Sequence, residues 1–236
     1  MNKTTIEWTE ITWNPTTGCT KITEGCKNCY AEKMANRLKA MGTPKYQHGF
    51  ALTLHRDTLL EPYSWKKPKV VFVNSMSDLF HEDVPFEFIQ EVFAVMNNNS
   101  KHIFQVLTKR ADILEQYSPI LNWTENIWMG VTVESNRQYK RVDHLRKSGA
   151  FIKFISCEPL LSSIKDISLF EIDWVIVGGE SGPSARPIKK EWVIEMKDKC
   201  QSQNIPFFFK QWGGTNKKKA GSMLDGTYYK SVPLSF

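Results

Sequence analysis

Seven short apolar runs, spaced along almost the whole chain, constrain the fold of this sequence more than any other feature. They are residues 12–15, 70–74, 103–107, 128–133, 151–156, 174–177 and 206–210. Most of them are continuously apolar and do not alternate with polar residues. That pattern is typical of strands that are buried on both faces of a parallel sheet.

Helical patterns lie between these runs, at residues 30–41, 86–96, 111–117, 137–147 and 191–203. The first of them is rich in strong helix formers and stops at Gly42, and the second starts after Pro85. Strands that alternate with helices predict a parallel sheet with right-handed crossovers. Six or seven such units predict an α/β fold, a partial (β/α)6–7 TIM-like barrel. A doubly wound open sheet is the alternative.

A chain of 236 residues fits one large α/β domain better than two small ones. We expect the barrel to span residues 1–214, with an insertion or lid at about residues 43–68, where prolines and aromatics gather. Residues 215–236 are rich in Lys and Gly and are expected to form a C-terminal tail.

The charge balance bears on partners and location. The net charge is +6 and the pI is about 9.0, which is compatible with an anionic partner such as a nucleic acid or a nucleotide. No run approaches the roughly 18 apolar residues of a membrane helix. The polar N-terminus lacks the apolar segment of a signal peptide. We therefore expect a cytoplasmic protein with no membrane partner.

Polar residues follow nearly every predicted strand. They are Ser75, Ser77 and Asp78 after the second strand, Lys109 and Arg110 after the third, Glu134 after the fourth, Glu158 after the fifth, Glu180 after the sixth and Lys210 in the seventh. The carboxyl ends of parallel strands meet at one edge of the sheet, where the active sites of such folds form. The set therefore predicts a shared pocket, although any single member could instead cap a helix.

Three of the five cysteines, Cys19, Cys26 and Cys29, lie within eleven residues as C-x6-C-x2-C, just after the first predicted strand. In a cytoplasmic protein such a group indicates metal binding or catalysis. Three thiolates can hold three irons of a 4Fe–4S cluster and leave the fourth iron open. Zinc needs four ligands, so Cys157, Cys200 or a distant histidine would have to supply the last.

A three-cysteine loop after the first strand of a β/α barrel resembles the radical S-adenosylmethionine (radical SAM) superfamily. The spacing differs from the usual C-x3-C-x2-C, and Asn28 stands where an aromatic residue usually precedes the last cysteine. The chain is also similar to a three-cysteine-motif family of phage and bacterial genomes, and its layout more distantly resembles spore photoproduct lyases. That likeness is carried by TWNPTTGCTKITEGCKNCYAE, SMSDLFHEDVP, QVLTKR, ISCEPLL, VIVGGESGPSARP and FFKQWG.

The resemblance implies an iron–sulfur enzyme. Its 4Fe–4S cluster would be held by the three cysteines and would bind S-adenosyl-L-methionine at the open iron. An electron donor would reduce the cluster, which then yields a 5′-deoxyadenosyl radical. The cofactor-binding residues it implies are Ser75, Ser77 and Asp78 at the methionine amino group, Glu134 near the ribose or carboxylate, and Gly178, Gly179 and Glu180 on the adenine side.

Cys157, Glu158 and Lys210 are the candidate catalytic residues, with Cys157 either a hydrogen donor to a radical or a small buried hydrophobic residue. Arg186 either clamps an anionic group or pairs with a local acid. The positive charge favours a nucleic acid or nucleotide as the substrate. The alternative function is a zinc-stabilised nucleic-acid-binding module that performs no catalysis.

Overall fold

In the computed structural model of the chain, which describes residues 4–233, seven parallel strands form one sheet. They are β1 (Ile11–Trp13), β4 (Val70–Val73), β5 (Ile103–Thr108), β6 (Ile127–Thr132), β7 (Ile152–Cys157), β8 (Trp174–Gly178) and β9 (Phe207–Gln211). Each corresponds to one of the seven apolar runs, and no end is shifted by more than two residues.

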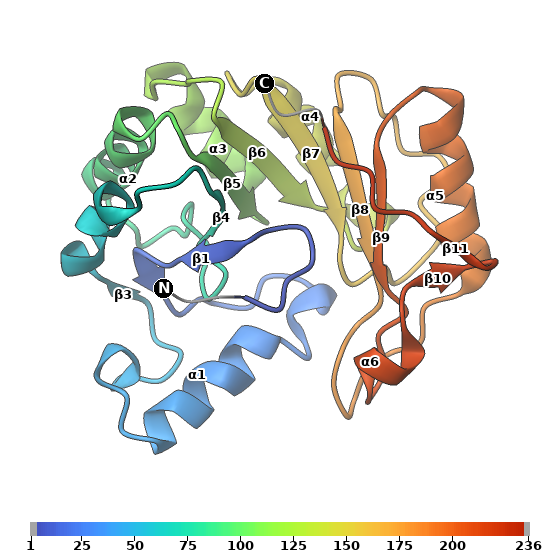
Figure 1. Cartoon of the computed structure of the whole chain (residues 1–236), viewed down its shortest axis with the longest axis horizontal. Helices are drawn as coiled ribbons and strands as arrows, with labels where there is room; N and C mark the ends of the chain where they lie inside the picture. Colours follow the sequence, from blue (N-terminus) through green and yellow to red (C-terminus); the bar gives the residue numbers. More distant parts are fainter. Residues whose placement is uncertain (1–3, 234–236) are drawn as a thin grey trace.

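The strands stand in the sheet in the order in which they occur in the chain. A doubly wound sheet reverses its strand order at a switch point, so the doubly wound alternative is wrong. The sheet curls into an arc, with α2 to α5 along its outer side (Figure 1). Within residues 4–233, no pairing joins β1 to β9, so the arc is an open, partial TIM-like barrel.

The five predicted helices all form. The α-helices are α1 (Tyr30–Ala40), α2 (Phe86–Asn98), α3 (Ala111–Tyr117), α4 (Lys140–Arg146), α5 (Lys190–Ser202) and the short α6 (Lys217–Ala220). The 3₁₀ helices are η1 (Glu24–Cys26), η2 (Pro44–Tyr46), η3 (Arg56–Ser64), η4 (Ser118–Ile120) and η5 (Asn136–Gln138). The segment predicted as one helix at 137–147 is divided into η5 and α4. Short strands complete the chain at β2 (Thr16–Thr17), β3 (Thr53–Leu54), β10 (Met223–Leu224) and β11 (Thr227–Tyr228).

The main core lies between the sheet and the outer helices. Helix α2 shows why: Phe88, Val92 and Met96 recur every four residues, share one face and are fully buried against the strands. Burying a side chain of this size contributes about 1.5–3 kcal/mol. This core fixes the arc of strands on which the site is built.

A second cluster of large side chains fills the inner side of the arc near the amino ends of the strands. Its buried members are Trp8, Phe72, Trp128, Phe154, Trp174, Ile176 and Phe208. The Trp174 ring lies 6.2 Å from that of Trp8 and 5.5 Å from that of Phe154, between ring centroids. We call this cluster the aromatic floor. It closes the lower part of the half-barrel, so the polar strand ends stand above it.

Helix α1 does not join the other helices on the outer side (Figure 1). Its Ala31 and Ala35 pack instead against Tyr46 of the 43–68 segment and against Met76. That segment contains η2, β3 and η3, and β3 pairs with β2. The insertion therefore supports α1 and the residues that precede it.

The tail returns to the sheet. Leu224 is buried in the main core, Lys230 forms an antiparallel bridge with Phe208 of β9, and the Trp174 indole donates a 2.9 Å hydrogen bond to the carbonyl of Ser231. The described part of the tail thus covers one edge of the sheet. Among residues 4–233, no helix is both long enough and apolar enough to span a membrane.

Candidate iron–sulfur site

The three cysteines of the motif lie on one loop, residues 18–29, which we call the cysteine loop. Gly18 starts it with φ of +83°, and a Cβ there would lie 2.2 Å from the carbonyl oxygen of Ala51, so only glycine fits. The next amide, of Cys19, donates a 3.2 Å hydrogen bond to the carbonyl of Phe50. Cys26 ends η1, and Cys29 directly precedes α1. All three thiols are free and partly exposed.

The cysteine loop is fastened to the carboxyl ends of the strands by side chains from its own sequence. The Thr23 hydroxyl donates a 2.8 Å hydrogen bond to Glu134 after β6. The Asn28 amide donates a 2.9 Å hydrogen bond to Glu180 after β8. The Thr20 hydroxyl lies 2.9 Å from Nε2 of His81, beyond β4. These contacts hold the cysteines over the end of the half-barrel where sites form in such folds.

Arg110 links Cys19 to the strand ends. Its Nη1 donates to the Cys19 sulfur at 3.4 Å and to Asp78 at 3.2 Å, and its Nη2 donates to the Thr20 hydroxyl at 2.7 Å. Burial and the Asp78 carboxylate raise the pKa of the Cys19 thiol, Arg110 lowers it, and the net result is a pKa of about 11. Arg110 is thus the cation that favours a Cys19 thiolate, as metal binding requires.

The environment of Cys26 differs. Burial alone would raise the pKa of this thiol. The positive charge of Lys109 and hydrogen bonds from Ile22 and Thr23 outweigh burial, so the pKa is lowered. Lys109 and Arg110, which directly follow β5, therefore each favour the thiolate form of a different cysteine.

The donor set distinguishes between the two metals considered from the sequence. In the part of the chain that the structure describes, no three or more His, Cys, Asp and Glu side chains stand close enough to hold one metal ion. A structural zinc needs four ligands within about 2.0–2.3 Å of one point. A 4Fe–4S cluster takes one thiolate per iron, so its cysteines share a loop without converging on one point. The cysteine loop offers three free thiols, one for each of three irons of such a cluster.

The fourth ligands proposed for zinc lie elsewhere. Cys157 and Cys200 are fully buried in the main core, on the side of the sheet that faces the helices. Burial raises the pKa of both thiols, that of Cys200 to about 12. Neither points to the cysteine loop. The structure therefore favours the alternative in which Cys157 is a small core residue, and it does not bring this residue to the site.

Glu134 is the most enclosed acid of the predicted pocket. Its side chain is fully buried and pairs with Arg141 at 2.8 Å, and Nζ of Lys109 lies 3.9 Å from Oε1. A Cβ at Gly25 would lie 2.4 Å from the same oxygen. Glu134 is thus held between the cysteine loop and α4.

Glu158 and Lys210 meet on the inner side of the half-barrel. Nζ of Lys210 lies 2.8 Å from Oε1 of Glu158, and the Ser156 hydroxyl donates to the other oxygen at 3.2 Å. Both members of the pair are partly exposed. Successive residues of a strand point to opposite faces, so Ser156 and Glu158 face inward while Cys157 faces the helices. Two of the three predicted catalytic residues are therefore adjacent.

Glu180, which is buried, pairs with the partly exposed Arg186. The guanidinium donates to both carboxylate oxygens, at 2.6 and 3.0 Å. Burial would raise the pKa of Glu180, but Arg186 and Asn28 outweigh it and lower the pKa to about 2. Arg186 also donates to the carbonyl of Glu24 in the cysteine loop. Of the two alternatives for Arg186, pairing with a local acid is the one observed.

The residues after β4 are mostly engaged within the protein. The Ser77 hydroxyl donates to the carbonyl of Thr16 at 2.8 Å, and Asp78 accepts from Thr108 at 2.6 Å as well as from Arg110. Ser75 is more open: its hydroxyl donates to Asn14 at 3.1 Å, and its carbonyl accepts from the Tyr30 hydroxyl.

Protein atoms occupy the space beside Gly178, the last residue of β8, and beside Gly179, which follows it. A Cβ at Gly178 would lie 2.7 Å from a Glu158 oxygen, and one at Gly179 would lie 2.0 Å from the carbonyl oxygen of Trp212. Gly179 therefore lacks a side chain because neighbouring backbone packs against it, which is a different reason from the close ligand approach that we expected.

Sequence reasoning missed the side chains that position the cysteine loop. Thr23 and Asn28 are inside the motif, and Asn28 stood out only as a departure from an expected aromatic residue. Arg110 is committed to Asp78, Glu82 and Cys19. Its position directly after a strand end was the one available signal.

The model of a family described as "Protein of unknown function (DUF5131)" matches residues 3–233. No curated protein matches the sequence. The fold is similar to that of "Spore photoproduct lyase complexed with dinucleoside spore photoproduct", with a TM-score of 0.49 and 11% identity over 78% of this chain and 58% of that chain. A mutant of the same lyase gives a TM-score of 0.49 and 10% identity over 73% and 56% of the two chains. This chain thus spans less than two thirds of the length of either structure.

Proposed function

The chain belongs to the DUF5131 family, and we propose that it is a radical SAM enzyme whose 4Fe–4S cluster is held by Cys19, Cys26 and Cys29. One observation supports this most strongly. Three free, partly exposed thiols share a short loop that is fastened to strand ends of an open half-barrel. Active sites of parallel α/β barrels are built at this end of the strands.

Such a cluster, when bound, supplies the electron that cleaves S-adenosylmethionine to methionine and a 5′-deoxyadenosyl radical, given an external electron donor. The residues of this chain prepare the loop for it. Arg110 and Lys109 favour the thiolates of Cys19 and Cys26. Glu134 and Glu180 hold the loop through Thr23 and Asn28. We therefore assign these four charged residues a positioning role.

We further propose that S-adenosylmethionine binds on the inner side of the half-barrel, above the aromatic floor. Ser75, Glu158 and Lys210 stand there with polar groups that are partly open to solvent. Lys210 has the charge to bind the methionine carboxylate, and Glu158 has the charge to bind the amino group. Ser77 and Asp78 act indirectly, through Thr16 of β2 and through Arg110. Glu134, Gly178 and Glu180 border this space.

The test is anaerobic reconstitution with iron and sulfide, followed by incubation with a strong reductant and S-adenosylmethionine. We expect about four irons per chain, broad absorption near 400 nm from Fe–S charge transfer, and formation of 5′-deoxyadenosine. Replacing all three loop cysteines by Ala removes the iron and the product. The matched control is Cys200→Ala, which removes a core cysteine and keeps both.

Two results would overturn the proposal. One is a colourless protein that binds stoichiometric zinc, which would favour the zinc-stabilised module. The other is a protein with a full cluster that forms no 5′-deoxyadenosine above the triple-cysteine control and whose electron-paramagnetic spectrum does not change when S-adenosylmethionine is added.

A further inference from the structure

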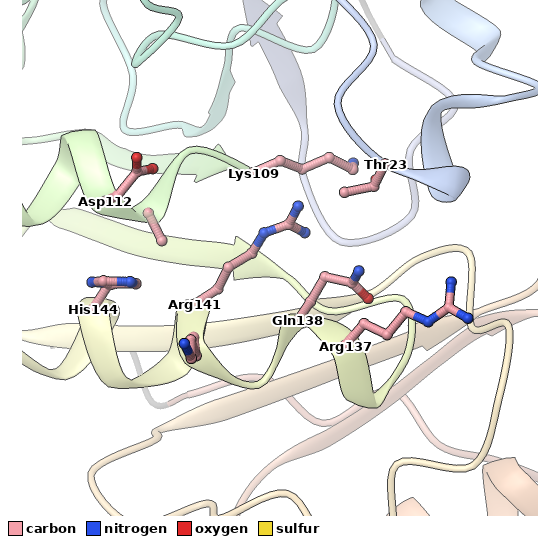
Figure 2. Close-up of a pocket in the computed structure, with 9 residues that line it drawn as sticks. Thr23, Lys109, Asp112, Arg137, Gln138, Arg141 and His144 are labelled. Atoms are coloured by element: carbon pink, nitrogen blue, oxygen red, sulfur yellow. The ribbon is translucent and has the colours of Figure 1, made fainter.

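A cavity of about 380 Å³ adjoins the cysteine loop on the side of α3 and α4. Thr23 of the loop, Lys109 at the end of β5, and Arg137, Gln138, Lys140 and Arg141 of the η5–α4 segment are among the residues that line it. Figure 2 shows Lys109 extending toward Thr23 along one side of this cavity, while Arg141, Gln138 and Arg137 come from its opposite side. Nothing in the proposed function uses this cavity.

The lining is mainly cationic. Arg141 is committed to Glu134, at 2.8 Å. Lys109 stands 3.9 Å from the same carboxylate, and Arg137 stands 4.0 Å from Glu24, so both pairs are at the outer limit of an ion pair. Each of these two cations keeps hydrogen-bond donors available for another acceptor.

The remaining groups at this end are also donors. Oε1 of Gln138 accepts from the amide and the hydroxyl of Ser135 in a capping box, which leaves the Nε2 hydrogens of Gln138 for the cavity. Lys140 is exposed and makes no ion pair within residues 4–233. The acid of the lining, Asp112, lies beside His144 at the opposite end, away from Arg137 (Figure 2).

We propose that this cavity binds a phosphate group of a nucleic-acid substrate. Arginine, lysine and a fixed amide present only donors to a ligand, and a phosphate offers several acceptor oxygens with negative charge. S-adenosylmethionine carries no phosphate, so the ligand is a different molecule from the proposed cofactor. The net charge of +6 assists the approach of a polyanion.

The proposal names the substrate class of the proposed function, and it rests on that function in treating the ligand as a substrate. Because Thr23 belongs both to this cavity and to the cysteine loop, a phosphate bound here lies next to the proposed iron–sulfur site. The substrate class is therefore nucleic acid. The bound phosphate fixes the position of the nucleic acid on the protein and carries no information about the base sequence.

The test measures binding of a fluorescently labelled 12-nucleotide single strand by anisotropy. The reconstituted protein is used without reductant or S-adenosylmethionine, so that binding is measured separately from cleavage. The variant Arg137→Gln/Lys140→Gln removes two cations of the cavity. Its matched control, Lys66→Gln/Lys67→Gln, removes two exposed lysines of the 43–68 segment.

We expect the cavity variant to bind at least tenfold more weakly and the control variant to bind within twofold of the unaltered protein. The negative slope of log K against log salt becomes smaller in magnitude by about 1–2 for the cavity variant. The reason is that binding releases fewer counterions when the protein makes fewer phosphate contacts. Competition by a mononucleotide, but not by inorganic phosphate alone, also supports a phosphate that belongs to a nucleotide chain.

Equal weakening in the two variants, or no binding by the unaltered protein, would overturn the proposal. Displacement of the strand by poly-glutamate at the same charge concentration would do so too, because it would show a general anion surface. Failure of S-adenosylmethionine cleavage leaves these binding results standing, and failure of binding leaves the cleavage result standing.

Discussion

The Thr23 hydroxyl of the cysteine loop donates a 2.8 Å hydrogen bond to Glu134, whose side chain is completely buried after β6. The same carboxylate pairs with Arg141, which is also buried. A single strand-end acid therefore connects the proposed iron–sulfur site to α4 and to the cavity beside it. The predictions below test this connection and its neighbours.

Glu134→Ala is expected to lower the free energy of unfolding by about 3–5 kcal/mol, because it leaves the buried Arg141 charge without a partner. Urea denaturation of the metal-free protein measures it. The matched control is Glu115→Ala, which removes partly exposed pairs with His144 and Lys147 and is expected to cost much less, because water screens such pairs. Equal losses in the two variants would show that the buried Glu134–Arg141 pair contributes no more to the free energy of unfolding than a partly exposed pair does.

Gly25→Ala is expected to displace the cysteine loop, because the new Cβ would lie 2.4 Å from Oε1 of Glu134. The φ angle of Gly25 is not positive, so the effect is steric and not one of backbone strain. We expect a loss of iron bound after reconstitution, measured per chain. In a Glu134→Ala background the clash is absent, so Gly25→Ala should cost less there. Additive effects in this double-mutant cycle would contradict the close packing.

Most of the fold could be predicted from the sequence because its strands are continuous apolar runs. It was harder to predict which residues at each strand end face the inner side of the half-barrel. Ser156 and Glu158 are polar and flank Cys157, so the alternation at the end of β7 already indicates that Cys157 faces the helices. The run before it is apolar on both faces, and this masks the alternation.

The network around Arg110 could not be predicted in the same way. It joins Arg110 to Cys19, 91 positions earlier in the chain, and to Asp78. A pairing over that distance depends on how neighbouring strands curl, and nothing local in the sequence specifies it. The role of Gly179 is similarly hidden, since the atom that excludes a side chain there belongs to Trp212.

Cys157 and Cys200 are expected to resist alkylation in the native, metal-free protein at pH 8, while Cys26, which is partly exposed and whose pKa is lowered, reacts. Both are fully buried, and burial raises the pKa of Cys200 to about 12, so about one in ten thousand of its thiols is ionised at that pH. Peptide mass spectrometry after a short pulse of iodoacetamide locates the labels. Rapid labelling of Cys157 would show that it is open to the site.

Arg110→Gln is expected to reduce the iron bound per chain at least threefold, because Cys19 loses the cation that favours its thiolate and Asp78 loses its partner. The matched control is Arg56→Gln, since Arg56 pairs with Glu91 on the surface. Circular dichroism should show that both variants keep their helices. Full iron content in Arg110→Gln, with an unchanged cluster spectrum, would remove Arg110 from its positioning role.

Lys210→Met is expected to weaken S-adenosylmethionine binding at least tenfold while the cluster content stays at the level of the unaltered protein. Lys210 lies on the inner side of the half-barrel, paired with Glu158 at 2.8 Å and partly open to solvent, where a methionine carboxylate can compete for its charge. Calorimetric titration of the reconstituted protein measures the affinity. Lys230→Met is the matched control, because Lys230 forms a bridge with Phe208 of β9 and pairs with Glu7 at 2.6 Å, away from Glu158. The two lysines thus differ in the acid with which they pair and not in charge. If both variants bind S-adenosylmethionine as the unaltered protein does, the inner pair is structural, and the cofactor site has to be sought on the other strand ends, starting with Ser75.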